Sequence, residues 1–211
     1  MPRFFLKSMA ILFLCLAPTL SKADTIKVGV IGIFSGTFAD LGARMKRGID
    51  LYLKVNGDTI AGKKVELIYK DVGGSSGDVA KRLTTELVVR DKVHILTGFL
   101  ATPNTKASLP IATRAKRPML LMQAATSGLT GMSPYSARLS YTLGQVSTPI
   151  GTWAAKNNIK SVFTIVADYG PGYDAEKAFS QAYKKGGGKI VGGVRVPLGN
   201  LDFAPYVQRA R

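Results

Sequence analysis

Short apolar segments that alternate with helix-like segments are the feature that most constrains the fold of this chain. The first segment, residues 26–32, is rich in β-branched residues and almost wholly apolar, as a strand of a buried parallel sheet should be. Leu41, Met45 and Ile49 then recur at helical spacing, before a second apolar run at 65–70. This β-α-β-α-β order, with right-handed crossovers, predicts a parallel sheet covered by helices.

The remaining elements follow from the same periodicities. Further strands are predicted at residues 93–97, 119–122, 162–166 and 190–196. Several side chains are expected to begin helices by capping their free amides, namely Asp40, Asp78, Thr102 and Asp174. Pro110 is expected to break or kink the helix that precedes the fourth strand, because proline removes a backbone donor.

The pattern restarts after about residue 142, which predicts two Rossmann-like α/β lobes with parallel sheets joined by a hinge. We expect residues 24–141 to form the first, ligand-binding lobe, and a hinge near residues 140–143. Residues 142–211 would then begin the second lobe. Two strands alone would leave an open sheet edge and a thin core, so the sequence is expected to be the N-terminal part of a longer protein.

Residues 1–23 have the features of a secretory signal peptide. Arg3 and Lys7 precede an apolar run at residues 9–17, which is too short to cross a bilayer of about 30 Å. Small residues then flank Lys22, and cleavage is predicted after Ala23 with release into the periplasm. Cys15 follows a bulky leucine, so it is interpreted as apolar filler rather than a lipid attachment site.

Composition excludes several classes of function. The formal net charge is +16, but the basic residues are scattered, which favours a solvated surface over nucleic-acid binding. The one histidine, His94, falls within an apolar run and is expected in the core. With one histidine and one cysteine, and with no glycine-rich cofactor fingerprint, neither a metal, a cofactor nor an enzymatic activity is predicted.

A binding site is expected where the strands end, because ligands of parallel α/β sheets lie outside their carboxyl ends. Three loops rich in small and hydroxyl residues should meet there, carrying Ser35, Thr102 and Thr126. Thr102 precedes Pro103, so free amides and the positive end of a helix dipole would favour an anionic ligand group. Alternatively, Thr102 serves only to cap its helix.

The order of several motifs resembles type I periplasmic binding proteins of the Leu/Ile/Val-binding kind, which serve ABC importers. The matching segments are 24–30 with Phe34-Ser35-Gly36, 61–65, 98–102, 123–126, 168–172 and 202–205. The resemblance implies two lobes that close around a carboxylate-bearing solute. The position of Ser35 together with the resemblance gives the expected ligand-binding set: Ser35, Leu41, Leu100, Ala101, Thr102, Ala124, Thr126 and Tyr169.

The resemblance also implies individual roles. The loop ending at Thr102 would contact the ligand carboxylate, with Thr126 as a second hydroxyl. The Ala124 carbonyl would accept from a ligand ammonium. Leu41 would touch the ligand side chain, and Tyr169 would cover it from the second lobe. Pro171 replaces the usual aromatic residue, and the acidic partner of a ligand amine would be expected later in the chain, so the ligand class stays open between an amino acid, an amide and an aromatic acid.

These features predict a solute-binding protein of an ABC importer, with a permease as partner and only peripheral contact with the membrane. Micromolar affinity, about −8 kcal/mol, would demand contacts from both lobes, so a protein ending at Arg211 is expected to bind weakly. Two alternatives remain. One is an exported sensor domain of the same fold. The other is a secreted hydrolase using Ser35 or Asp168, although neither has a general base nearby in the sequence pattern.

Overall fold

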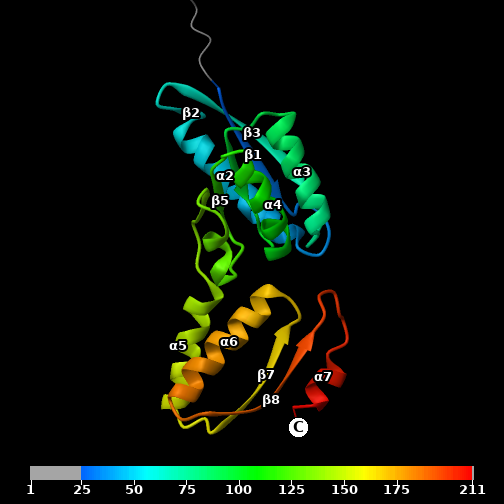
Figure 1. The fold of residues 1–211 in the computed structure, drawn as a ribbon, viewed down its shortest axis with the longest axis vertical. Coiled ribbons are helices and arrows are strands. Elements are labelled where there is room, and N and C mark those ends of the chain that lie inside the picture. Colours follow the sequence, from blue (N-terminus) through cyan, green and yellow to red (C-terminus); the bar gives the residue numbers. More distant parts are fainter. Residues whose placement is uncertain (1–24, 211) are drawn as a thin grey trace, which may run out of the picture.

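The computed structural model describes residues 25–210. The predicted signal peptide, its cleavage after Ala23 and the interpretation of Cys15 lie outside the described residues. Within the described residues, no helix is both long and apolar enough to cross a membrane. The elements form two groups, a first lobe of residues 26–138 and a second lobe of residues 143–208, each with its own sheet (Figure 1).

The sheet of the first lobe has six strands in the order β2-β3-β1-β4-β5-β6. Neighbouring strands are parallel except β2 and β3, which pair antiparallel. The strands are β1 (Ile26–Gly32), β2 (Thr59–Ile60), β3 (Lys63–Asp71), β4 (Ile95–Gly98), β5 (Met119–Leu121) and β6 (Ser136–Arg138). The parallel α/β architecture predicted from the alternating pattern is therefore confirmed.

The helices of the first lobe cover the two faces of the sheet unequally. They are α2 (Ala39–Asn56), α3 (Gly77–Val89) and α4 (Thr102–Arg114), with a short 3-10 helix at Ser127–Met132. The main buried cluster joins α3 and α4 to the strands, and Leu87, Leu96 and Leu121 in it are fully buried. The opposite face is covered by α2 alone, which leaves an apolar groove along α2 and β3.

Part of the apolar face predicted for α2 points to solvent. Tyr52 and Val55 are 56% and 72% exposed, although they continue the helical spacing from Leu41. Only Gly42 of this helix is buried, because it lies directly against the Ile33 carbonyl. Helix α2 therefore packs tightly near its N-terminus, where the sheet carries the candidate site.

The second lobe is thinner. Strands β7 (Ser161–Ala167) and β8 (Lys189–Val196) pair parallel, and α7 (Ala204–Gln208) ends the described chain. Helices α5 (Leu143–Lys156) and α6 (Gly170–Lys185) run side by side (Figure 1). Their contact uses small residues of α5, namely Ser147, Gly151 and Ala154. A Cβ at Gly151 would come within 2.5 Å of the Phe179 carbonyl, so glycine allows this close approach.

One chain crossing, residues 139–142, connects the two lobes (Figure 1). It contains the predicted hinge. Its end is fixed by a capping box, in which the Thr142 hydroxyl accepts from the Gln145 amide and the Gln145 side chain accepts from the Thr142 amide. Leu143 also donates its backbone N–H to the Ala125 carbonyl of the first lobe, at 2.9 Å.

Several predicted helix boundaries differ from the structure. Asp40 and Asp78 do not cap their helices: Phe38 and Ser76 occupy those positions, and Ser76 accepts from the Val79 amide. The two carboxylates lie instead in the first turn, where they still favour the helix dipole. Helix α6 begins at Gly170, before the cap predicted at Asp174.

Two further expectations are wrong. Helix α4 continues through Pro110, which lies on its exposed face, where water can satisfy the carbonyl that the proline leaves without a donor. His94 is exposed rather than in the core, because β4 begins one residue later. Its Nδ1 accepts from the Lys27 backbone N–H at 2.9 Å, at the end of the sheet opposite to the carboxyl ends of the strands.

Candidate functional site

The loops that follow β1, β4, β5 and β7 meet between the two lobes. They enclose a pocket of about 190 Å³, smaller than the roughly 300–1,000 Å³ of sites for drug-sized ligands. Its lining is mostly apolar and aromatic: Ile33, Phe38, Leu41, Leu100, Ala101, Gln123, Ala125, Tyr141, Leu143, Tyr169 and Pro171. Residues of both lobes and of the connecting segment therefore contribute to one small pocket.

A backbone turn at the end of β4 brings the first-lobe loops together. Gly98 and Phe99 both have positive φ values, 99° and 59°. A Cβ at Gly98 would lie 2.1 Å from the Ile31 carbonyl, so only glycine fits there. Phe99 is fully buried, and its amide and carbonyl bond Ile31 and Ala124 at 2.8 and 2.9 Å. This turn fixes the loop after β4 against the loops after β1 and β5.

Helix α4 starts at Thr102, so Ala101 rather than Thr102 is its N-cap residue. The prediction of Thr102 as the cap is wrong because Ala101 still has extended dihedral angles, with φ −108° and ψ 142°. No side chain caps the helix, and the hydroxyl of Thr105 bonds the Ala101 carbonyl instead. The alternative that Thr102 serves only as a cap is thereby removed, and its hydroxyl has another partner.

That partner is Thr126: the two hydroxyl oxygens lie 2.8 Å apart. The Thr102 side chain is only 3% exposed, and the start of α6 covers it. A Cβ at Gly170 would lie 3.1 Å from Thr102 Cγ2 and 3.2 Å from Thr126 Oγ1. The first residues of α4 and α6 thus converge on one pair of hydroxyls, and both helix ends add positive potential there.

Because the start of α6 buries Thr102, access to this side chain depends on the position of the second lobe. The covering group is backbone of the second lobe, not a side chain of the first, so the hydroxyl pair is reached when α6 moves away. Movement of that kind requires rotation about residues 139–142, which form the one connection between the lobes in the described part of the chain. The geometry therefore combines a buried pair of hydroxyls at the first-lobe edge with a cover that belongs to the second lobe.

Arg138 is a residue of this region that sequence reasoning missed. It ends β6, and its guanidinium donates from Nε to the Ala124 carbonyl at 3.2 Å and from Nη2 to the Thr126 carbonyl at 2.5 Å. Burial lowers the pKa of Arg138, while the negative charge of Asp174 opposes that shift. The short strand β6 gives no clear periodicity, so no sequence signal placed Arg138 beside this loop.

The predicted ligand-binding residues are only partly brought together. Leu41, Leu100, Ala101 and Tyr169 line the pocket, and Thr102, Ala124 and Thr126 lie beside it. The Ala124 carbonyl, expected to meet a ligand ammonium, already accepts from Arg138. Burial raises the pKa of Tyr169, which keeps its phenol neutral.

Ser35 is not placed with the two threonines. It is exposed, does not line the pocket, and its hydroxyl bonds the carboxylate of Asp71 at the end of β3. Asp71 also accepts from the amides of Phe34 and Gly73, at 2.7 and 2.8 Å. Burial raises the pKa of Asp71, but these hydrogen bonds outweigh it and leave the pKa below the ordinary value. Ser35 therefore stabilises the loop.

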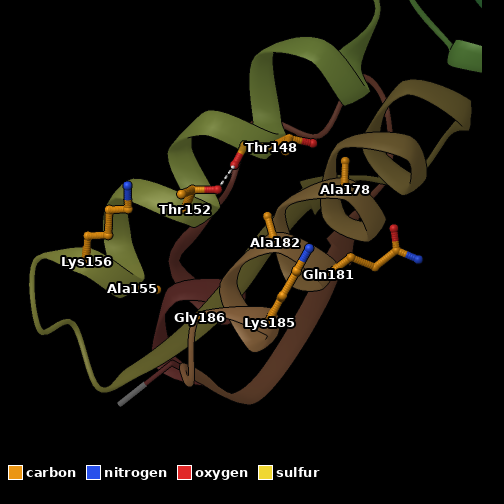
Figure 2. A pocket seen from close by; sticks show the side chains of 9 residues that line it. All are labelled: Thr148, Thr152, Ala155, Lys156, Ala178, Gln181, Ala182, Lys185 and Gly186. Atoms are coloured by element: carbon orange, nitrogen blue, oxygen red, sulfur yellow. Dashed lines mark hydrogen bonds between the residues drawn. The ribbon is translucent and has the colours of Figure 1, made fainter.

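A second, larger hollow lies elsewhere, in the groove between α5 and α6 (Figure 2). It has a volume of about 520 Å³ and a floor of small residues, with Lys156 and Lys185 near one end. The Thr152 hydroxyl, which could contact a ligand, bonds the Thr148 carbonyl of its own helix. Because this groove is on the helices and not at the carboxyl ends of strands, the interlobe pocket is the better candidate.

Among residues 25–210, no group of three or more histidine, cysteine or acidic side chains is arranged to hold a metal ion. The pocket lining itself contains no acidic or basic side chain. Its polar groups are the phenols of Tyr141 and Tyr169 and the amide of Gln123. This lining suits a solute with an apolar body and hydroxyl groups.

Comparison with known proteins gives consistent matches. Residues 25–211 match a family described as periplasmic binding protein. The Leu/Ile/Val-binding protein homolog 6 of Brucella abortus is 44% identical over 196 residues, which are 93% of this chain and 50% of that protein. The chain thus spans about half the length of the curated relatives it matches.

Two solved structures from Rhodopseudomonas palustris superpose well. The solute-binding protein of an ABC transporter from strain BisB5, in complex with 3,4-dihydroxybenzoic acid, is 49% identical with a TM-score of 0.85, over 88% of this chain and 51% of that one. A second solute-binding protein, in complex with 4-hydroxybenzoate, is 42% identical with the same TM-score, over 88% and 50%. In both, the shared part is again half of the other chain.

Proposed function

Because the chain belongs to the periplasmic binding protein family, we propose that it is the solute-capturing component of an ABC importer. In this role it binds a carboxylate-bearing solute between its two lobes, in the periplasm, and delivers it to a membrane permease. The observation that carries the proposal is the Thr102–Thr126 hydroxyl pair at the first residues of α4 and α6, beside a pocket lined by both lobes.

We further propose that the solute is an aromatic acid of the hydroxybenzoate kind. The pocket is small, is lined by Phe38, Tyr141 and Tyr169, and includes no carboxylate that would neutralise a ligand ammonium. Phenols and the Gln123 amide are suited to hydrogen-bond ring hydroxyls. The two solute-binding proteins from R. palustris, each above 40% identical, hold hydroxylated benzoic acids.

A branched-chain amino acid is the second candidate. The names of the Brucella relatives favour it, and the apolar wall formed by Ile33, Leu41 and Leu100 suits an aliphatic side chain. It requires an acceptor for the ammonium, and the nearby Ala124 and Thr126 carbonyls already accept from Arg138. An aromatic acid needs no such acceptor, which is why we place it first.

The capture cycle follows from the burial of the threonines. In the open form, α6 lies away from the pair and the free amides of α4 attract the solute carboxylate. Closure then brings the start of α6 and Tyr169 over the solute. The hydrolase alternative is not supported: the Ser35 hydroxyl bonds Asp71, and His94 lies at the other end of the sheet. The family is one of solute-binding proteins rather than enzymes.

Replacing Thr102 by valine tests the anion contact. Thr102→Val keeps the shape of the side chain but removes the hydroxyl, so 4-hydroxybenzoate should bind more weakly by about 1.5–3 kcal/mol, the worth of a hydrogen bond to a charged group. Isothermal calorimetry on the full-length protein measures this. Thr113→Val is the matched control, since Thr113 also lies on α4 but bonds Leu109 and Ser133.

Unchanged affinity in a folded Thr102→Val protein would remove this residue from the site. The same calorimetry separates the two ligand classes. If leucine binds the unmodified protein more tightly than 4-hydroxybenzoate does, the aromatic acid proposal is wrong and the amino-acid candidate takes its place. If neither carboxylate binds, the anion-site proposal itself fails.

A further inference from the structure

Asp174 is a charged residue that no part of the proposed binding role uses. It lies on α6, within two turns of the helix start that covers the threonine pair. Its Oδ2 accepts from the backbone N–H of Ser127 at 3.0 Å and from the Ser127 hydroxyl at 2.7 Å. Ser127 directly follows Thr126, so this carboxylate contacts the ligand-binding loop of the other lobe.

These two hydrogen bonds have no counterpart elsewhere between the lobes. Within residues 25–210, the side-chain hydrogen bonds that cross from one lobe to the other both end on Asp174. Other interlobe contacts are the hydrogen bond from the Leu143 amide to the Ala125 carbonyl at the start of α5, the approach of Gly170 to Thr102 and Thr126, and the apolar walls of the pocket. None of these holds α6 at a fixed rotation over the first lobe.

A basic side chain of the first lobe lies near Asp174. Arg138 ends the neighbouring strand, and the charges of Asp174 and Arg138 attract each other. The same guanidinium holds the Ala124 and Thr126 carbonyls. The loop at residues 124–127 is thus bonded on one side by Arg138 of the first lobe and on the other by Asp174 of the second lobe.

We propose that Asp174 is a closure latch, a positioning residue whose two bonds to Ser127 hold the start of α6 over the ligand-binding loop. The latch rests on the proposed capture role, which it deepens. Because Asp174 can reach Ser127 only when the lobes are closed, it stabilises the closed form and not the open one. A ligand that requires the closed form therefore binds more tightly because of the Asp174–Ser127 hydrogen bonds, although it contacts neither residue.

Kinetics distinguish a latch from a direct ligand contact. The solute enters through the open form, in which the latch is broken, so loss of the latch should not lower the association rate. Escape requires opening, which the latch opposes, so its loss should raise the dissociation rate. Asp174→Ala should increase the dissociation constant by roughly three- to tenfold, as fits a partly exposed charge-assisted pair.

The experiment measures 4-hydroxybenzoate binding to the full-length protein by stopped-flow fluorescence for four proteins: unmodified, Ser127→Ala, Asp174→Ala and the double variant. The two single losses should not add, because Ser127→Ala removes only the hydroxyl bond, which Asp174→Ala removes together with the amide bond; the double variant should therefore resemble Asp174→Ala. Asp78→Ala is the control, since Asp78 is an exposed carboxylate near the start of another helix. Asp174→Asn, which keeps an acceptor but loses the charge, should fall between the unmodified protein and Asp174→Ala.

A ligand-free measurement keeps the latch testable even if 4-hydroxybenzoate does not bind. Spin labels on the exposed positions Lys106→Cys and Lys177→Cys report the distance between the lobes. Asp174→Ala should shift the distribution toward longer distances.

Identical distance distributions for the unmodified and Asp174→Ala proteins would overturn the latch, as would losses of affinity in the two single variants that simply add. Tighter binding by Asp174→Ala would also overturn it, because Asp174 would then be competing with the ligand carboxylate. If no carboxylate binds yet the distance still shifts, the proposed function fails while the latch stands.

Discussion

The two lobes differ in how their sheets are buried. In the first lobe, strands β1, β4 and β5 share one contiguous buried cluster with helices α3 and α4, which includes Leu87, Leu96 and Leu121. In the second lobe, the two strands carry few buried side chains. The largest fully buried side chain of this lobe, Tyr183, lies on α6 instead. Close contact between α5 and α6 through small residues replaces a sheet core there.

This difference matches the division of roles at the site. The first lobe holds the α4 helix start, Thr102 and Thr126 on loops fixed by buried neighbours such as Phe99. The second lobe supplies the start of α6, which moves in the proposed capture cycle. In that proposal, the firmly packed lobe carries the carboxylate-binding groups, and the lightly packed lobe carries the cover. Three predictions test this contrast.

The largest effect is expected in the core of the first lobe. Leu121→Ala removes a fully buried side chain from β5 and should lower the free energy of unfolding by about 2–5 kcal/mol. Val194→Ala, on β8 of the second lobe, should cost less, because Val194 is 9% exposed and its sheet has two strands. Urea unfolding of both variants checks the order. An equal or greater loss for Val194→Ala would contradict the contrast.

A smaller effect is expected on the stability of the protein at low pH. The pKa of Asp71 is lowered in the folded protein, so its contribution to stability is present above the unfolded value of about 3.9 and is lost as the pH falls through the lower folded value. Thermal unfolding midpoints should therefore decline below about pH 4 in the unmodified protein, and less steeply in Asp71→Asn. Parallel declines would show that Asp71 does not contribute to acid sensitivity.

The smallest effect is expected on α5. Val146, Ile150 and Trp153 form a stripe at helical spacing, yet Trp153 is 58% exposed because the opposite, small-residue side of α5 packs on α6. Trp153→Ser should therefore change the free energy of unfolding by no more than about 0.5 kcal/mol. Thermal or urea unfolding measures it. A loss above 2 kcal/mol would indicate that this side packs far more than its exposure shows.

Sequence patterns predicted β1, β3, β4 and β5 of the first sheet and the α/β class, because continuous apolar β-branched runs are typical of buried parallel strands; the short strands β2 and β6 were missed. The patterns did not predict where individual helices and strands begin, because the backbone angles of one residue determine that position. Ala101 remains extended and moves the start of α4 to Thr102, and His94 lies just outside β4. Periodicity carries no information about either.

The convergence of two loops at the candidate site was predicted for a related reason. Topology alone brings the loops of Thr102 and Thr126 to one edge, so their proximity was predictable. The partners of Arg138, Asp174 and Ser35 were not, since each depends on side-chain directions across separate loops. Residues that join distant segments have no local pattern by which a sequence could indicate them.

The turn at Gly98 and Phe99 also bears on how such a protein changes its ligand over evolution. In the proposed binding mode, main-chain geometry and two short hydroxyl side chains hold the solute carboxylate, whereas ordinary side chains such as Leu41 and Tyr141 face the rest of the solute. Peptide amides persist through most point substitutions. Substitution of the pocket side chains would therefore change which solute binds, while the main-chain contacts to its carboxylate are retained.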